Sequence, residues 1–232
     1  MKKLVFLGSG LSISILKEAA EEMGYEVAGI IDNDYYGNTT NFCDIPLING
    51  QSCFDDPAVA AYYRENFVFF FAINWLPMKD AISVRNKAKR HDIIALIKEH
   101  NLECINIISS MTTISKSATL GKGIFIGQIV SLEAHCIIND FSNIWGHQVI
   151  GHHAQIGENC QIQRHAELYG SAKIGDNVYL GSHVGVVQDA VIGDNVWVQP
   201  GIIVCRNAEN NEIIGSTKKS LRRTVPYYGT SP

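Results

Sequence analysis

The sequence predicts a small α/β domain followed by an all-β solenoid, and two patterns carry that prediction. The first is a fixed period of six residues. From Ile114 to Val204 an aliphatic residue stands at every sixth position, and the residue four places after it is mostly small or apolar. Neither a 3.6-residue helix nor a simple two-residue strand alternation returns the same side every six residues with a turn between. Three such units would form one triangular coil, and coils stack at about 4.8 Å. The second pattern is a βαβ unit in residues 3–31.

Apolar runs and their boundaries predict the elements that precede the solenoid. The run from Lys3 to Leu7 is typical of a buried strand, and Gly24 can terminate the amphipathic stretch that follows. Residues 35–56 are polar and turn-rich and predict a loop. The expected strands are 3–7, 25–31, 66–73 and 102–108, and the expected helices are 12–23 and 78–100. On the second helix we expect a solvated basic face of Arg85, Lys87, Lys89 and Arg90.

The turn after the first strand has the sequence Gly8-Ser9-Gly10, and the second strand ends at Asp32-Asn33-Asp34. Such a turn lets the backbone approach a phosphate at a helix N-terminus, and an acid at the second strand end can meet a ribose hydroxyl. The third glycine of a dinucleotide motif is missing. The pattern therefore favours some nucleotide or anion over a dinucleotide in particular.

Composition excludes several classes of function. The chain of 232 residues has a formal net charge of -4 and 18% charged residues, which gives no reason to expect nucleic acid or an anionic membrane as a partner. No apolar run approaches the length of a bilayer span and no signal sequence is evident, so a cytoplasmic location is the default expectation. The six cysteines form no CxxC pair, and we expect free thiols. A basic tail follows Val204; it could meet ligand phosphates or be a loose terminus.

Six of the eight histidines lie in the solenoid, and their register is informative. One ladder with a spacing of 18 residues is expected on one corner, a second ladder on another, and one histidine stands apart from both. Histidine suits solenoid corners, which by itself explains His135 and His183. His152 differs because it is adjacent to His153 and follows a glycine, and an imidazole is well suited to take a proton near neutral pH. The first ladder is His147, His165 and His183, the second is His135 and His153, and the separate residue is His152.

The six-residue period resembles the hexapeptide-repeat, left-handed β-helix superfamily. With the GSG turn, the strand end IIDND and the run VIGHHAQIGENCQIQRHAELYGSAKIGDN, the chain resembles bacterial acetyltransferases of nucleotide-linked amino sugars or sialic acid. The resemblance implies a Rossmann-like nucleotide-sugar domain at 1–110, a left-handed parallel β-helix with acyltransferase activity at 111–207, and a tail at 208–232. It also implies a homotrimer with acetyl-CoA lying between subunits, and no metal.

The resemblance assigns roles to individual residues. His152 matches the proposed general base, which would deprotonate the sugar amine or hydroxyl for direct transfer without a covalent intermediate. His153 stands where an acidic residue normally orients that base. Gln161 occupies the place of a second histidine that faces the thioester, and His165 follows one turn later. The remaining implied contacts are Gly170, Gly181 and Gly201 for the co-substrate, and Gly8, Gly10, Asp32 and Asn33 for the nucleotide.

Two other functions remain open at this point. His147 and His152 have the spacing of two zinc ligands in trimeric β-helix carbonic anhydrases, but the third ligand would fall at Met111. A non-catalytic scaffold that binds nucleotide sugar or acyl-CoA would also explain why His153 replaces the acid. The sequence specifies neither the sugar, nor the base of the nucleotide, nor whether nitrogen or oxygen is acylated.

Overall fold

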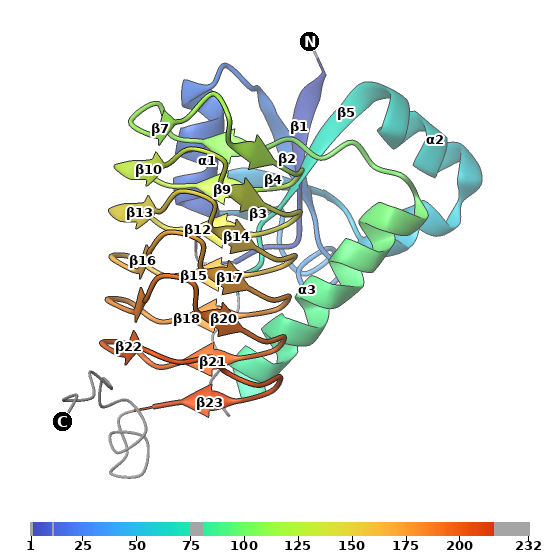
Figure 1. Ribbon diagram of the computed structural model, residues 1–232. Coiled ribbons are helices and arrows are strands. Elements are labelled where there is room, and N and C mark those ends of the chain that lie inside the picture. Colours follow the sequence, from blue (N-terminus) through green and yellow to red (C-terminus); the bar gives the residue numbers. More distant parts are fainter. Residues whose placement is uncertain (1, 11, 75–80, 216–232) are drawn as a thin grey trace, which may run out of the picture. The chain divides into compact units, whose positions relative to one another are not determined.

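The computed structural model describes residues 2–10, 12–74 and 81–215, and the chain divides into two compact units, Met1–Ser110 and Met111–Pro232 (Figure 1). The first unit is an α/β domain, and the second is a stack of short strands that forms a parallel β-helix. The predicted fold class is therefore confirmed for both parts of the chain.

The first unit is built on a five-stranded sheet with the order β3-β4-β2-β1-β5. All pairs are parallel except β3 with β4, and β1 lies between β2 and β5 with four successive residues fully buried. The continuous apolar run of β1 fits an interior strand of a parallel sheet, because helices cover both faces of such a sheet. The strands are β1 Lys3–Leu7, β2 Val27–Ile31, β3 Asn41–Phe42, β4 Ile45–Asn49, β5 Phe67–Phe71 and the short β6 Ile107–Ile108, and the helices are α1 Ile13–Glu22, the 3₁₀ helix η1 Gln51–Asp55, α2 Pro57–Asn66 and α3 Ala81–Glu99.

The observed elements differ from the prediction in three places. The predicted loop at 35–56 contains β3, β4 and η1, because Cys43 and Asp44 both adopt positive φ and close a two-residue hairpin. The helix α2 was not predicted, although Asp56 caps it by accepting from the N–H of Ala58 and Pro57 stands at its start. The predicted strand at 102–108 is reduced to β6 and one isolated bridge between Phe69 and Cys104.

The second unit has three faces of parallel strands, and partners are 18 residues apart, as in the pair Leu132 and Ile150. The first face holds β7 Thr113–Ile114, β10 Val130–Leu132, β13 Gln148–Ile150, β16 Glu167–Leu168, β19 Gly185–Val186 and β22 Ile203–Val204. The second face holds β8 Thr119–Leu120, β11 Ile137–Ile138, β14 Gln155–Ile156, β17 Lys173–Ile174 and β20 Val191–Ile192. The third holds β9 Phe125–Ile126, β12 Asn143–Ile144, β15 Gln161–Ile162, β18 Tyr179–Leu180, β21 Trp197–Val198 and β23 Ile213–Ile214.

Corner geometry explains the composition of the repeat. From Ile129 to Asn195 every sixth residue has a φ between 56° and 62°, the left-handed region that asparagine, histidine and glycine tolerate best. The aliphatic residue of each unit points inward, and Ile138, Ile156 and Ile174 are nearly inaccessible to solvent. The β-helix does not end at residue 207 as predicted, because Trp197 pairs with Ile213 in a final coil that is two residues shorter than the others. Most of the predicted tail, from residue 216 on, lies outside the described residues.

Candidate active site

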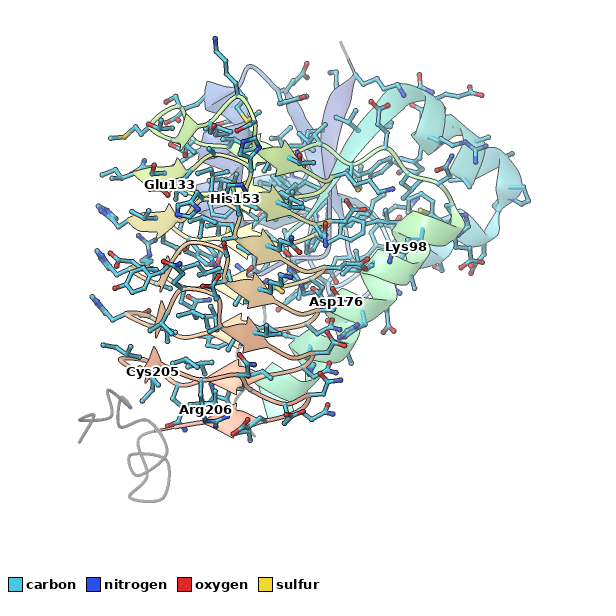
Figure 2. The ribbon with its side chains drawn as sticks, viewed as in Figure 1. Lys98, Glu133, His153, Asp176, Cys205 and Arg206 are labelled. Atoms are coloured by element: carbon cyan, nitrogen blue, oxygen red, sulfur yellow. The ribbon has the colours of Figure 1, made fainter. Side chains whose placement is uncertain are left out.

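His152 lies at the corner between β13 and β14, where two exposed imidazoles meet. Its backbone N–H donates to Glu133 Oε2 at 2.8 Å, and its Nδ1 is 3.2 Å from Nδ1 of His153. The two rings are nearly perpendicular, at 83°. Glu133 comes from the preceding coil, and Figure 2 labels it beside His153. Because two lone pairs cannot face each other at this distance, one Nδ1 carries a proton and the other accepts it.

The His152 ring occupies space that Gly170 leaves open on the next coil. A Cβ atom built on Gly170 would lie 2.5 Å from both Cε1 and Nε2 of His152. The Nε2 edge of the ring is therefore close to the Gly170 backbone. Among the described residues, the buried Gly170 N–H donates no hydrogen bond. The corner thus combines an accessible base with an uncommitted backbone donor.

The other residues predicted for the co-substrate lie elsewhere on the chain. His165 belongs to a different corner, stacked between His147 and His183 with ring centroids 5.0 Å and 4.7 Å apart, as the register predicted. Gly181 packs against Pro200, and Gly201 continues the His165 register with φ 75° and open space beside it. These residues do not meet His152 within one chain.

Gln161 is on β15 and is completely buried. Neither atom of its carboxamide has a hydrogen-bond partner among the residues that the structure describes. The structure therefore groups His152, His153 and Gly170 at one corner and leaves Gln161 apart from them.

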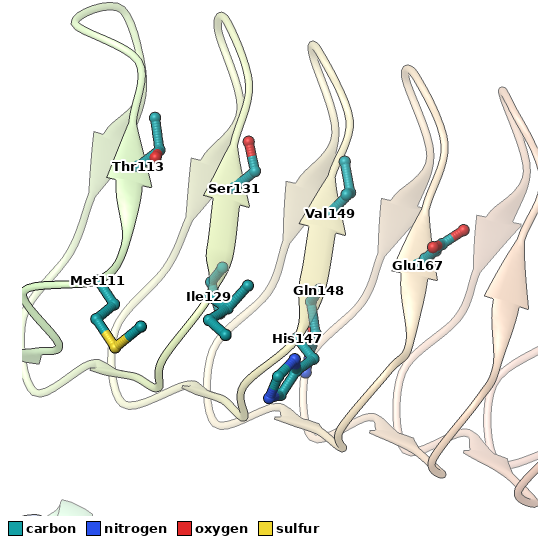
Figure 3. A pocket seen from close by; sticks show the side chains of 9 residues that line it. Met111, Thr113, Ile129, Ser131, His147, Gln148, Val149 and Glu167 are labelled. Atoms are coloured by element: carbon teal, nitrogen blue, oxygen red, sulfur yellow. The ribbon is translucent and has the colours of Figure 1, made fainter.

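A groove that sequence reasoning missed runs along the first face of the β-helix. It has a volume of about 330 Å³, and Figure 3 shows its lining as two rows, with Thr113, Ser131, Val149 and Glu167 on successive strands and Met111, Ile129 and His147 along the corner. Met111 and Ile129 are about half exposed, at 56% and 49%. One feature of the sequence indicates this groove: Ile129 is an apolar residue at a corner position where later coils carry histidine.

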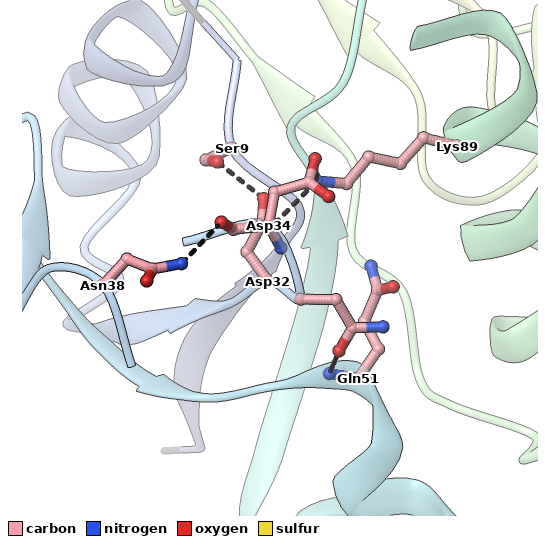
Figure 4. A network of polar contacts seen from close by, with 7 residues as sticks. Ser9, Asp32, Asp34, Asn38, Gln51 and Lys89 are labelled. Atoms are coloured by element: carbon pink, nitrogen blue, oxygen red, sulfur yellow. Dashed lines mark hydrogen bonds and ion pairs between the residues drawn. The ribbon is translucent and has the colours of Figure 1, made fainter. Parts of the chain in front are cut away.

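In the first unit, the Asp32 carboxylate is completely buried (Figure 4). Its Oδ2 accepts from Ser9 Oγ at 2.5 Å, and its Oδ1 accepts from the Asp34 N–H at 2.8 Å and from Lys89 Nζ at 2.6 Å. Lys89 also contacts Asp34 Oδ2 at 2.7 Å. Asn33 Oδ1 accepts from the backbone N–H of Gln51. The carboxylate at this strand end therefore holds the loop, the turn and α3 together.

The glycines of the first turn are required for packing. A Cβ on Gly8, which has φ 76°, would lie 2.6 Å from Ile73 Cγ1, and a Cβ on Gly10 would lie 2.6 Å from the Ala72 carbonyl oxygen.

The predicted basic face of the long helix is wrong at two positions. The Lys89 side chain is only 11% exposed, and Arg90 is fully buried, with its guanidinium 4.1 Å from the Phe71 ring centroid. Buried acceptors at the strand ends explain why both cations turn inward.

Among residues 2–10, 12–74 and 81–215, no group of three His, Cys, Asp or Glu side chains could hold a metal ion. All six cysteines are free, as predicted, and burial raises the pKa of the Cys136 thiol, which disfavours a thiolate nucleophile there. No helix within the described part of the chain is long and apolar enough to span a bilayer.

Comparisons with known proteins agree with this fold. A family model described as bacterial transferase hexapeptide (six repeats) matches residues 153–188. No curated protein matches the chain. A mutant of perosamine N-acetyltransferase from Caulobacter crescentus, solved with CoA and GDP-perosamine, is 21% identical with a TM-score of 0.76 and covers 92% of this chain and 93% of its own.

Two further solved structures are similar over the same length. The acetyltransferase domain of PglB from Neisseria gonorrhoeae is 17% identical with a TM-score of 0.64, and WeeI from Acinetobacter baumannii is 15% identical with a TM-score of 0.60. Each covers 92% of this chain and 96% of its own. At these identities the likeness shows a shared fold, an α/β domain followed by a left-handed parallel β-helix.

Proposed function

We propose that this protein transfers an acetyl group from acetyl-CoA to the amino or hydroxyl group of a nucleotide-linked sugar, with His152 as the general base. The observation that carries the proposal is the exposed His152 imidazole over Gly170, at a corner where the chain supplies both a proton acceptor and a backbone donor. Supporting it, one similar fold was solved with CoA and GDP-perosamine and another with acetyl coenzyme A. A cytoplasmic location remains an expectation from the sequence.

The chemistry follows from the two groups at the corner. Acetyl-CoA supplies the acyl thioester. His152 Nε2 takes the proton from the sugar nitrogen or oxygen as that atom forms its bond to the acyl carbon, and returns it to the thiolate when the carbon–sulfur bond breaks. The Gly170 N–H is suited to stabilise the negative charge that develops on the acyl oxygen. No step requires a cysteine or a metal.

The proposal includes assembly as a homotrimer, because one prism offers a corner but no opposite wall for the co-substrate. The exposed apolar lining of the groove supports this part. Ile129 is a β-branched residue at φ 56°, a conformation that costs about 1–3 kcal/mol in residues of this type. With Met111 and Val149 it forms apolar surface that a neighbouring copy would cover.

The activity is tested by release of free thiol from acetyl-CoA in the presence of nucleotide-linked 4-amino and 3-amino sugars. We expect turnover with at least one acceptor, and a fall in kcat of at least about 100-fold in His152→Ala. His183→Ala is the control, because it removes another exposed imidazole of the β-helix that lies at a different corner from His152. Wild-type protein that transfers to no acceptor, or full activity in His152→Ala, would contradict the proposal.

The assembly is tested by sedimentation equilibrium. We expect three times the chain mass of 25.6 kDa for the wild type and weaker association for Val149→Asp, which adds a charge to the groove. Val191→Asp is the control, since Val191 is equally exposed but lies on β20, on another face. A wild type that sediments as a monomer would refute the trimer. The activity assay would still test the acetyl transfer proposed for the corner.

A further inference from the structure

His153 occupies the position next to the base, and its geometry defines what it can do there. Its Nδ1 is 3.2 Å from His152 Nδ1, and its backbone N–H is bonded to the Ala134 carbonyl. His153 is exposed at a corner with a backbone φ of 58°, and its ring centroid lies 4.9 Å from that of His135 in the preceding coil. These restraints hold one ring nitrogen of His153 against one ring nitrogen of His152.

Only one of the two possible proton arrangements leaves His152 able to act. If the proton is on His152 Nδ1 and His153 accepts it, His152 Nε2 keeps a lone pair over Gly170. If His153 Nδ1 donates instead, a neutral His152 must carry its proton on Nε2, the atom that the reaction needs free. The direction of a single hydrogen bond therefore decides whether the base is available.

We infer that His153 is a positioning residue that acts as a neutral hydrogen-bond acceptor and holds His152 in its Nδ1–H form. This inference rests on the proposed function and explains how the site works without a carboxylate next to the base. An imidazole acceptor differs from a carboxylate in that imidazoles gain a proton close to neutral pH, and this difference can be measured. Once His153 is protonated, its Nδ1 becomes a donor, the hydrogen bond reverses, and the proton on His152 moves to Nε2.

Loss of activity at low pH should therefore depend on two protons rather than one. Protonating His152 removes the base directly, and protonating His153 removes it through the tautomer. The other titratable groups at this corner are His135, which stacks on His153, and Glu133, which accepts from the His152 N–H. Neither offers a ring or carboxylate atom within a hydrogen bond of His152 Nδ1 among the contacts of the described residues.

The experiment compares the wild type with His153→Asn and His153→Ala. Asparagine tolerates the left-handed backbone, as it does at Asn159 and Asn177, and its Oδ1 can replace the Nδ1 acceptor without titrating. In the wild type we expect log kcat to fall with a limiting slope of two on the acid side. In His153→Asn we expect kcat within a few fold of the wild type and a slope of one. In His153→Ala we expect kcat to fall at least about 10-fold.

A second readout does not depend on turnover. Nitrogen-15 NMR of the histidine rings reports directly which nitrogen of His152 carries the proton. We expect Nδ1–H in the wild type and in His153→Asn, and mainly Nε2–H in His153→Ala; His183→Ala should leave the His152 signals unchanged. An Nε2–H form in the wild type, or an acid slope of one, overturns the role of His153. If acetyl transfer is absent while NMR shows the expected tautomer, the proposed function fails and the arrangement of the two rings stands.

Discussion

In the first unit the Asp32 carboxylate at the end of β2 is buried and accepts hydrogen bonds on both oxygens. In the second unit the His152 imidazole stays exposed at a corner, and its Nε2 makes no hydrogen bond within the part of the chain that the structure describes. The α/β domain buries Asp32 because three segments converge on one strand end, and each brings a donor. A corner of the β-helix meets only the coils before and after it. Side chains that point outward from a corner therefore remain available to ligands, while those at the strand end of the domain stabilise the fold.

The largest effect that this comparison predicts is on the stability of the first unit. Replacing Asp32 by alanine removes the acceptor for Ser9 Oγ, the Asp34 N–H and Lys89 Nζ. We expect the free energy of unfolding to fall by about 3 kcal/mol, because an ammonium that is only 11% exposed loses its buried partner. Chemical denaturation followed by circular dichroism measures the change.

Asp34→Ala is the matched control for that variant. Asp34 also contacts Lys89, but its side chain is 38% exposed, so the loss should stay below about 1 kcal/mol. Equal losses in the two variants would mean that burial does not distinguish the two carboxylates. In that case the contrast between the domain and the corner would disappear.

The next effect concerns activity in the second unit. Gly170→Ala introduces a Cβ atom 2.5 Å from the His152 ring, which must turn away from the corner. We expect kcat to fall about 100-fold with little change in stability, since the backbone at Gly170 is not in the left-handed region. Gly185→Ala is the control, because its added Cβ would meet Ile203 at 3.7 Å, an ordinary contact. Full activity in Gly170→Ala would show that the His152 ring does not act from its position over Gly170.

The sequence predicted the β-helix and its histidine ladders because the repeat leaves few choices. Once the period is six, the positions of His147, His165 and His183 follow from counting, and the rings stack as expected. The stacking of successive coils also explains two of the glycines in the repeat. A Cβ on Gly157 or Gly175 would lie within 2.5 Å of a carboxylate oxygen from the next coil, so glycine is required before that corner.

The aperiodic domain was predicted less completely, for a physical reason. Whether Lys89 and Arg90 face solvent depends on which acceptors the sheet brings beneath α3, and no local pattern specifies that. Contacts between distant segments of the chain decide it, as with Ser9 and Asp32. The two-residue hairpin at Cys43 and Asp44 was missed because neither residue is the glycine that usually marks such a turn.

A smaller effect is expected at the acidic corner of the β-helix. Asp176, labelled in Figure 2, accepts the Glu158 N–H of the preceding coil with Oδ1 at 2.7 Å. We expect Asp176→Ala to cost about 1 kcal/mol, the usual value of one hydrogen bond. Asp176→Asn should be close to neutral, because Asn210 fills the same role for Asp194 in the last coil. If the asparagine variant were as unstable as the alanine variant, charge rather than the acceptor oxygen would support this corner.

The smallest effect concerns thiol reactivity and should leave stability and activity unchanged. Burial, followed by the charge of Asp55, raises the pKa of Cys53 in the first unit to about 11. Because the thiolate is the reactive form, alkylation of Cys53 should be slow at pH 8 and rise about tenfold per pH unit up to that value. The Cys160 thiol inside the β-helix should stay unmodified in folded protein, since it is completely buried and contacts the Gly175 carbonyl. Mass spectrometry of peptides after timed alkylation measures both. Labelling of Cys160 at the rate of exposed Cys43 would show that the coils separate in solution, and the β-helix would then be no more rigid than the domain before it.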